Sequence, residues 1–198
     1  MFETNTPPTA VKDRVQLPFQ FNVAKMLTET KALATEQFEY YKVIQLRAPA
    51  HLVDTSLPFP PPAEDYADGS WTDWLNTSAL EKSPYLKSII ESFQEKTTVT
   101  LVRLLRLAPN SIVKEHTDPT LGLEVEKSVI RLTIPILNND EMVFNLNKTP
   151  MNMKPGECWY LDLTKPHEVI NNVNEERINL TIDMIPNKWI RDIIEKNL

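Results

Sequence analysis

The first half of the chain has apolar residues at spacings that predict helices. The pattern predicts helices over residues 22–34, 78–81 and 84–94, a strand over 40–46, and an extended proline-rich loop over 49–63. Residues 78–81 (SALE) match a capping box with Ser78 as the N-cap. Ser83 and Pro84 precede YLKSIIESFQ as the N-cap and the first helical residue. Both signals place helix starts in this part of the chain.

From residue 97 the pattern changes to short runs that predict strands. We expect eight of them, over residues 97–107, 112–115, 129–137, 142–147, 151–153, 158–163, 168–173 and 178–185. Turn-forming residues separate several of these runs, including Pro109-Asn110, Pro155-Gly156 and Asn174-Glu175. Eight antiparallel strands in about 90 residues predict a double-sheet jelly roll. A last helix is expected over residues 188–196.

One predicted strand, residues 129–136 (VIRLTIPI), indicates how the two faces of its sheet differ. Its even positions are large and apolar, whereas the odd positions include Arg131 and Thr133. Side chains alternate across a strand, so one face needs a core and the other carries a charge and a hydroxyl. We expect the apolar face to pack on the N-terminal helices. The face with Arg131 and Thr133 would then line a polar barrel interior, which suits a ligand site.

These patterns together predict a mainly β fold. We expect a double-stranded β-helix, that is, a jelly-roll or cupin-like barrel, with an N-terminal α-helical flank. The flank of strand and helices would span residues 1–96, the barrel residues 97–185, and the C-terminal helix residues 186–198. All three would form one structural domain.

Composition narrows the class of function. Hydrophobic residues make up 41% and charged residues 24% of the 198 residues, as in ordinary globular proteins. A net charge of −6 disfavours nucleic acid as a partner, because that surface needs clustered Lys and Arg. The three glycines lie too far apart to form a phosphate-binding loop. Cys158 is the single cysteine, so no intramolecular disulfide can form, and a reducing compartment is expected.

The chain shows no sign of a membrane or export signal. Residues 1–14 are polar and contain prolines, unlike a signal peptide. No run approaches the roughly 18 apolar residues that span a bilayer. We therefore expect a cytoplasmic protein without a membrane partner.

His116, Asp118 and His167 are the candidate metal ligands. Residues i and i+2 of an extended segment point to one face, so His116 and Asp118 can reach the same cation. His167 lies 49 residues after Asp118, at the start of another predicted strand. A single buried histidine is more often structural than a ligand. Two histidines and one carboxylate, however, leave three metal positions open, which is typical of non-haem iron(II) oxygenases.

Arg177 lies ten residues after His167 on the next predicted strand. A hairpin through the Asn174-Glu175 turn would bring this strand back alongside the strand that follows His167. Its guanidinium could then bind a carboxylate at the far end of a ligand that the metal holds at the near end. The alternative is an arginine on the protein surface.

Residues 103–184 resemble the aspartyl/asparaginyl β-hydroxylase family of 2-oxoglutarate oxygenases, which includes bacterial proline hydroxylases. The resemblance rests on five ordered stretches: RLAPNSIVKEHTD (106–118), RLTIPI (131–136), KPGECWYLD (154–162), PHEVINN (166–172) and RINLTID (177–183). It implies that His116, Asp118 and His167 bind Fe(II). It also implies that the enzyme uses 2-oxoglutarate and O₂.

The resemblance further implies the contacts of the co-substrate. Arg177 would bind the distal carboxylate of 2-oxoglutarate, and Arg131 would lie near the oxo-acid or the substrate. Thr133 stands where some members carry a histidine, and we predict that it also contacts the co-substrate. Some members lack the carboxylate of the metal motif. The presence of Asp118 favours hydroxylation over halogenation.

Arg106 and Trp159 are the candidate substrate contacts. Arg103 and Arg106 lie on one predicted strand with opposite parity, so at most one faces the cavity. Either could meet a substrate carboxylate, and either could instead be solvated or ion-paired. Trp159 is expected at the barrel mouth or in the core. Trp71 and Trp74 could cover the barrel as part of a lid or pack on it.

The sequence thus predicts a 2-oxoglutarate-dependent dioxygenase that hydroxylates an amino acid, free or in a peptide. A cupin-like module that binds a metal or ligand without turnover is the alternative; it would keep the histidines but would not need Arg131 and Arg177 inside the barrel. A metal-dependent isomerase or hydrolase would need a carboxylate base near the metal. Glu115 and Glu168 flank the ligands but alternate to the opposite face.

Overall fold

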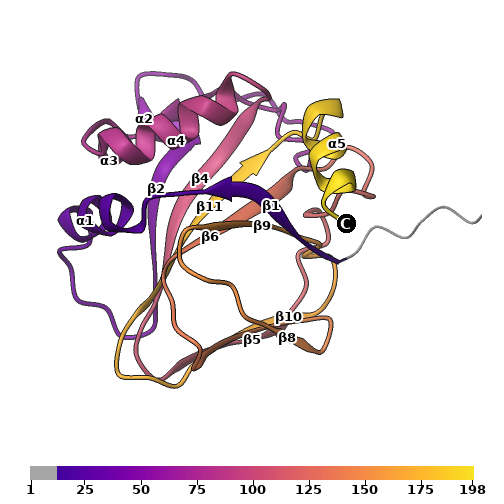
Figure 1. Cartoon of the computed structure of the whole chain (residues 1–198). Helices are drawn as coiled ribbons and strands as arrows, with labels where there is room; N and C mark the ends of the chain where they lie inside the picture. The colour runs from indigo at the N-terminus through magenta and orange to yellow at the C-terminus, as the bar shows by residue number, and fades with distance from the viewer. Residues whose placement is uncertain (1–12) are drawn as a thin grey trace, which may run out of the picture.

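Two antiparallel sheets face each other across a barrel in the computed structural model, which describes residues 13–198 (Figure 1). The larger sheet has the strand order β1-β9-β6-β11-β4-β2-β3, and the smaller has the order β5-β10-β7-β8. The larger sheet consists of β1 (Arg14–Gln20), β2 (Tyr41–Pro49), β3 (Trp74–Asn76), β4 (Val99–Leu107), β6 (Ile130–Leu137), β9 (Glu157–Leu161) and β11 (Arg177–Met184). The smaller sheet consists of β5 (Ser111–His116), β7 (Met142–Leu146), β8 (Thr149–Met151) and β10 (His167–Asn171). The predicted double-stranded β-helix is confirmed.

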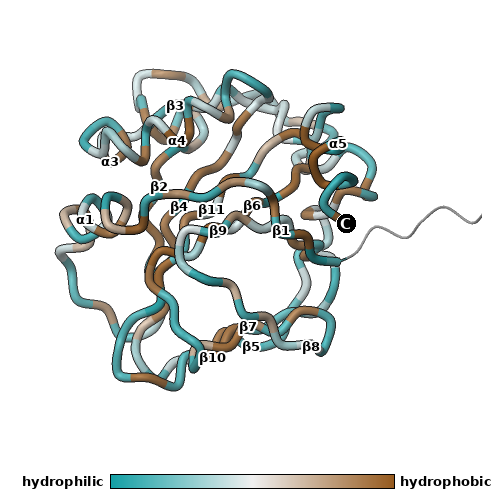
Figure 2. The backbone as a smooth tube through the Cα atoms, in the orientation of Figure 1, coloured by the Kyte–Doolittle hydropathy of each residue, from teal (hydrophilic) through white to brown (hydrophobic). Residues whose placement is uncertain are grey.

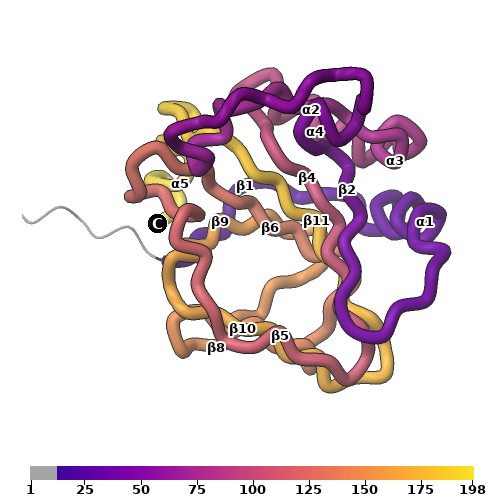
Figure 3. The backbone as a smooth tube through the Cα atoms, turned by 180° about the vertical axis from the view of Figure 1, so that it is seen from behind, coloured from indigo at the N-terminus to yellow at the C-terminus, as the bar shows by residue number. Residues whose placement is uncertain are grey.

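The helices lie on the outer side of the larger sheet, away from the smaller one (Figures 1 and 3). They are α1 (Val23–Leu33), α2 (Ala50–Val53), α3 (Ser78–Glu81), α4 (Pro84–Gln94) and α5 (Lys188–Lys196). The predicted apolar face of β6 packs against them. Ile130, Leu132 and Ile134 are fully buried in one core with Met26 of α1 and Leu86 of α4. In Figure 2 the central strands of the larger sheet are accordingly hydrophobic.

Two helix starts differ in detail from the capping predictions. The N-cap of α3 is Thr77 rather than Ser78, and the Thr77 hydroxyl accepts a hydrogen bond from the Leu80 amide (3.4 Å). Ser83 is the N-cap of α4, but its hydroxyl donates to Ala79 at the end of α3 instead of capping α4. The carboxylate of Glu29 on α1 accepts from the Tyr85 and Leu86 amides (2.8 and 2.9 Å). The cap of α4 is thus supplied from another helix.

The first part of the chain contributes strands to the barrel as well as helices. β1 pairs with β9, and β2 pairs with β4, in the larger sheet. The sequence analysis did not predict β1, β3 or α2. The division of the chain at residues 96/97 and 185/186 stays a prediction. The larger sheet contains strands from both sides of the first boundary.

Within residues 13–198, the helices are too short or too polar to cross a bilayer. The expectation about a signal peptide rests on residues 1–14, nearly all of which lie outside the described part of the chain.

Candidate active site

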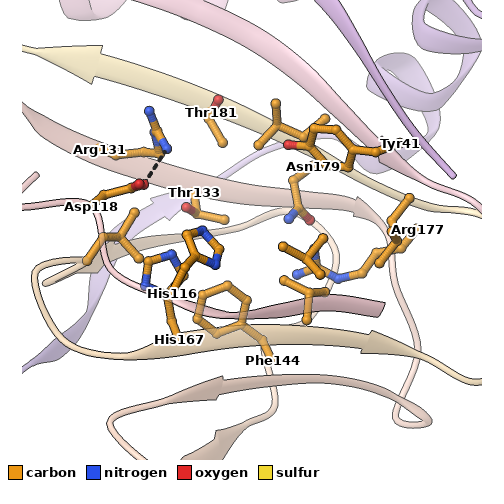
Figure 4. Close-up of a pocket in the computed structure, with 15 residues that line it drawn as sticks. Tyr41, His116, Asp118, Arg131, Thr133, Phe144, His167, Arg177, Asn179 and Thr181 are labelled. Atoms are coloured by element: carbon orange, nitrogen blue, oxygen red, sulfur yellow. Dashed lines mark hydrogen bonds and ion pairs between the residues drawn. The ribbon is translucent and has the colours of Figure 1, made fainter. Parts of the chain in front are cut away.

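The three predicted metal ligands meet at one end of the barrel. His116 ends β5 and His167 begins β10, and the pairing of these strands sets the two residues opposite each other with ring centroids 4.2 Å apart. Asp118 follows β5, where its amide donates to the Leu163 carbonyl (2.9 Å). One ligand atom from each of the three lies within 4.8 Å of those of the other two. They converge on a single point (Figure 4).

Backbone carbonyls orient both histidine rings for metal binding. Nδ1 of His116 lies 2.8 Å from the Lys114 carbonyl, and Nδ1 of His167 lies 3.0 Å from the Lys165 carbonyl. A carbonyl oxygen can only accept, so each Nδ1 carries the proton and each Nε2 keeps its lone pair. Burial lowers the pKa of His167, which favours the neutral ring that a metal needs. The donor set fits a divalent cation with open positions.

A cavity of about 100 Å³ extends from these ligands between the two sheets. Leu107, Val113 and Phe144 line its middle. Arg177 lies at the end opposite Arg131 and Asp118 (Figure 4). Thr133 of β6 lines the same space and is buried. The predicted residues His116, Asp118, His167, Arg131, Thr133 and Arg177 therefore share one cavity.

Arg177 is a buried cation whose partners are neutral amides. Only 4% of the residue is exposed. Its Nε donates to Asn138 Oδ1 (3.1 Å). With the Asn179 amide oriented so that its oxygen faces the guanidinium, Nη1 and Nη2 donate to that oxygen (2.6 and 3.0 Å). Among residues 13–198 its guanidinium has no ion-pair partner, whereas Arg103, Arg106 and Arg131 each pair with a carboxylate. Burial lowers the pKa of Arg177 to about 10, so the group stays charged at neutral pH.

Arg131 is also largely buried, but carboxylates surround it. Its Nε and Nη2 form a bidentate pair with the two carboxylate oxygens of Asp183 (2.7 and 2.8 Å). Its Nη1 lies 3.4 Å from Oδ2 of Asp118. Burial opposes its charge, but the Asp183 and Asp118 carboxylates outweigh that cost and raise the pKa of Arg131. Arg131 thus connects the metal ligand Asp118 to a second buried carboxylate.

The two predicted substrate contacts do not line the cavity. Leu105 and Leu107 of β4 face inward, so strand alternation turns Arg106 to the opposite side. There Arg106 pairs with Glu176 (2.7 Å) and packs over the Phe38 ring. Trp159 packs against the buried apolar cluster that includes Leu107 and Phe144, and its Nε1 donates a hydrogen bond to Glu157 (3.0 Å).

Three residues at the site were not anticipated. Tyr41 of β2 lines the cavity near Asn179, Asn138 holds Arg177, and Asp183 holds Arg131 (Figure 4). Tyr41 and Asn138 reach the site through pairings between strands distant in sequence, which no local pattern signals. The parity of β11 could have indicated Asp183, because it is six residues after Arg177 and so lies on the same face.

Comparison with known proteins agrees with this geometry. The family model described as aspartyl/asparaginyl beta-hydroxylase matches residues 64–186. L-proline cis-3-hydroxylase 2 of Streptomyces sp is 32% identical over 110 residues, which cover 54% of this chain and 37% of that protein. L-proline cis-4-hydroxylase of Rhizobium meliloti (strain 1021) is 25% identical over 123 residues, covering 60% and 43%. The chain spans less than half the length of these curated relatives.

Solved structures share the fold at low sequence identity. An oxidoreductase of the 2OG-Fe(II) oxygenase family from Burkholderia pseudomallei has a TM-score of 0.55 and 16% identity over 87% of this chain and 84% of that one. The viral collagen prolyl hydroxylase of Paramecium Bursaria Chlorella virus-1 has a TM-score of 0.50 and 10% identity over 89% and 97%. The family match covers more than half of the sequence. The chain therefore belongs to the aspartyl/asparaginyl beta-hydroxylase family.

Proposed function

We propose that this protein is an Fe(II)- and 2-oxoglutarate-dependent dioxygenase that hydroxylates an amino acid, free or within a peptide. The observation that carries the proposal is Arg177. It is a buried cation with amide partners, and it lines the same cavity as His116, Asp118 and His167. A buried charge without a counter-charge is costly, so the cavity favours an anion beside it.

A dicarboxylic oxo-acid fits both ends of this cavity. Arg177 binds the distal carboxylate through a charge-assisted, bidentate contact. At the other end His116, Asp118 and His167 would hold the metal, and the oxo-acid end of the ligand would take positions that these three leave open. Thr133 lies along the cavity wall and offers a hydroxyl to the near end. The apolar side chains between the two ends, such as Val113 and Phe144, exclude water from the ligand.

The metal and co-substrate supply the oxidising chemistry, in which O₂ and 2-oxoglutarate become succinate, CO₂ and the hydroxyl of the product. The protein's own residues position the reactants. Arg131 holds the outer oxygen of Asp118, which leaves the other carboxylate oxygen for the metal. The Lys114 and Lys165 carbonyls hold the two histidine rings with Nε2 free.

Arg103 is the proposed contact for the substrate carboxylate in place of Arg106. It lies on β4, and its Nη2 is 3.8 Å from Asp183. Its buried Nε has no hydrogen-bond partner among residues 13–198. A partly desolvated guanidinium with a free donor suits a substrate carboxylate. The proline hydroxylase names of the curated relatives support an amino acid as the substrate.

The two alternatives have less support. A cupin-like module without turnover gives no reason for a buried cation at Arg177. An isomerase or hydrolase needs a base near the metal, but Glu115 contacts Lys148 (3.2 Å) and Glu168 contacts Asn145 (2.7 Å), outside the cavity. A cytoplasmic location remains a prediction of the sequence.

Succinate release tests the proposal. The purified chain, supplied with Fe(II), 2-oxoglutarate and O₂, is assayed against a panel of free amino acids and short peptides. We expect succinate and hydroxylated product in equal amounts with at least one substrate. Protein that binds Fe(II) but neither binds nor consumes 2-oxoglutarate would favour the cupin-like module instead.

A further inference from the structure

A second cavity opens on the outer side of Asp118 and Arg131. It shares these two residues with the first cavity, so the two spaces meet beside the metal ligands. It occupies about 440 Å³, compared with about 100 Å³ for the first. Arg103 and Asp183 lie on its wall with Arg131. A molecule bound there would lie beside the metal ligand Asp118.

Three aromatic side chains form the opposite wall of this second cavity. Tyr66, Trp71 and Trp74 line it, and the ring centroid of Trp71 lies 5.2 Å from that of Tyr66 and 5.8 Å from that of Trp74. They come from the segment between α2 and α3. The rings form a continuous apolar surface that faces the charged groups.

Local contacts hold this aromatic wall in place. Trp74 Nε1 donates to the Gly69 carbonyl (2.8 Å), and the Asp68 carboxylate accepts from the Ser70 amide (2.9 Å). Gly69 has a φ of +71°, and a Cβ there would lie 2.8 Å from Thr100 Cγ2. Glycine therefore lets the turn press against β4. These contacts order the turn that carries the aromatic residues and place it against β4.

We infer that the second cavity binds the substrate and selects a free amino acid whose side chain is larger than the proline ring and is aliphatic or aromatic. This inference rests on the proposed function. Arg103, whose buried Nε has no hydrogen-bond partner among residues 13–198, pairs with the substrate carboxylate. The side chain then packs against Trp71 and Tyr66.

The aromatic lining of the second cavity carries the choice of side chain. Tyr66, Trp71 and Trp74 offer three adjacent rings, and the small proline ring can contact only part of that surface. A longer side chain covers more of that apolar surface, and binding improves with the apolar area removed from water.

Calorimetric titration without O₂ tests the inference. Proline, leucine and phenylalanine are titrated into the full chain loaded with Fe(II) and 2-oxoglutarate. We expect leucine or phenylalanine to bind at least about 10-fold more tightly than proline. Trp71→Ala should weaken phenylalanine binding by about 10-fold and change proline binding by less than about 2-fold. Trp71→Phe should restore most of the phenylalanine affinity.

Phe59→Ala is the matched control. Phe59 belongs to the same segment but is 82% exposed and does not line the second cavity. It should leave all three affinities unchanged. Proline binding as tightly as phenylalanine, or an equal loss of both in Trp71→Ala, would overturn the inference. So would N-acetyl-phenylalanine amide binding as tightly as free phenylalanine, because it has no carboxylate for Arg103. Failure of 2-oxoglutarate to bind in the loading step would instead overturn the proposed function itself.

Discussion

The two arginines of the first cavity differ in their partners and not in their burial. Arg131 on β6 and Arg177 on β11 lie on neighbouring strands of the larger sheet and project into the same space. Arg131 is held by the carboxylates of Asp183 and Asp118. Arg177 is held by the amides of Asn138 and Asn179. The charge of Arg131 is therefore neutralised by protein carboxylates, whereas the charge of Arg177 has no counter-charge from the described residues.

The difference follows from the cost of burying charge. A buried ion pair is nearly neutral to stability when it is complete, but removal of one partner exposes the other to the full desolvation penalty. Amides satisfy the hydrogen-bonding groups of a guanidinium and leave its charge uncompensated. Under the proposed function, arginine therefore neutralises a buried carboxylate at one end of the cavity and is available to an anion at the other.

The largest expected effect is the loss of stability in Arg131→Leu. This substitution leaves Asp183 buried with only Arg103, whose Nη2 is 3.8 Å away. We expect the free energy of unfolding to fall by about 3–5 kcal/mol, measured by urea denaturation. Arg131→Leu combined with Asp183→Leu should recover most of the loss, because Asp118, the other partner of Arg131, is about one third exposed and stays hydrated. A change of less than about 1 kcal/mol in the single variant would show that Asp183 does not depend on Arg131.

The next effect concerns the binding of 2-oxoglutarate. Arg177→Leu removes the charge at the closed end of the cavity and should weaken 2-oxoglutarate by about 100-fold, since hydrogen bonds to charged groups contribute about 1.5–3 kcal/mol. Fe(II) affinity should stay the same. Anaerobic calorimetry measures both. Arg106→Leu is the control, because Arg106 pairs with Glu176 outside the cavity. Equal affinities in Arg177→Leu and the unmodified protein would remove the basis of the proposed function.

A smaller effect, on Fe(II) affinity, is expected when Arg131 stays in place but loses the charge of its partner Asp183. Asp183→Asn keeps the shape of the side chain but removes the charge that fixes Arg131 beside Asp118. Fe(II) affinity should fall by about 10-fold, as for other residues that orient metal ligands. Binding of 2-oxoglutarate to Fe(II)-saturated protein should change by less than about 2-fold. If 2-oxoglutarate binding falls as much as Fe(II) affinity, the two ends of the cavity are coupled and the contrast between them is wrong.

The sequence predicted which residues face the barrel interior in strands where apolar and polar residues alternate without interruption. In β6, four large apolar residues at even positions left one possible direction for Arg131 and Thr133. In β4, Arg103 and Arg106 lie on opposite faces of the strand. Alternation therefore showed that only one of them can face the cavity, but not which one. Only the pairing of β4 with β11 and β2 decides which faces inward.

The missed elements had weak or short signals. β1 has the alternating residues Val15, Leu17 and Phe19, but Pro18 interrupts the run, and β1 indeed lies at the edge of its sheet, where proline is tolerated. β3 has only three residues, too few for a period. The neutral partners of Arg177 come from a loop after β6 and from β11. Asn179 is two residues after Arg177 on the same face of β11, so alternation could have indicated it, whereas Asn138 reaches Arg177 only through the pairing of β6 with β11.

The smallest expected effect is on the stability of the ligand-free protein when Arg177 is replaced. Arg177→Leu removes a buried charge that has no carboxylate partner, so no counter-charge is left behind. The amides of Asn138 and Asn179 do lose hydrogen bonds, which costs about 1–3 kcal/mol in total. Relief from the desolvation of the guanidinium offsets that cost.

We expect the free energy of unfolding of ligand-free Arg177→Leu to stay within about 1 kcal/mol of the unmodified protein, in the same urea titration that detects the loss in Arg131→Leu. Saturating 2-oxoglutarate with Fe(II) should then stabilise the unmodified protein more than the variant, because only the former binds the co-substrate tightly. A loss of about 3 kcal/mol or more in the ligand-free variant would mean that Arg177 supports the fold as Arg131 does, and the contrast between the two ends of the cavity would fail.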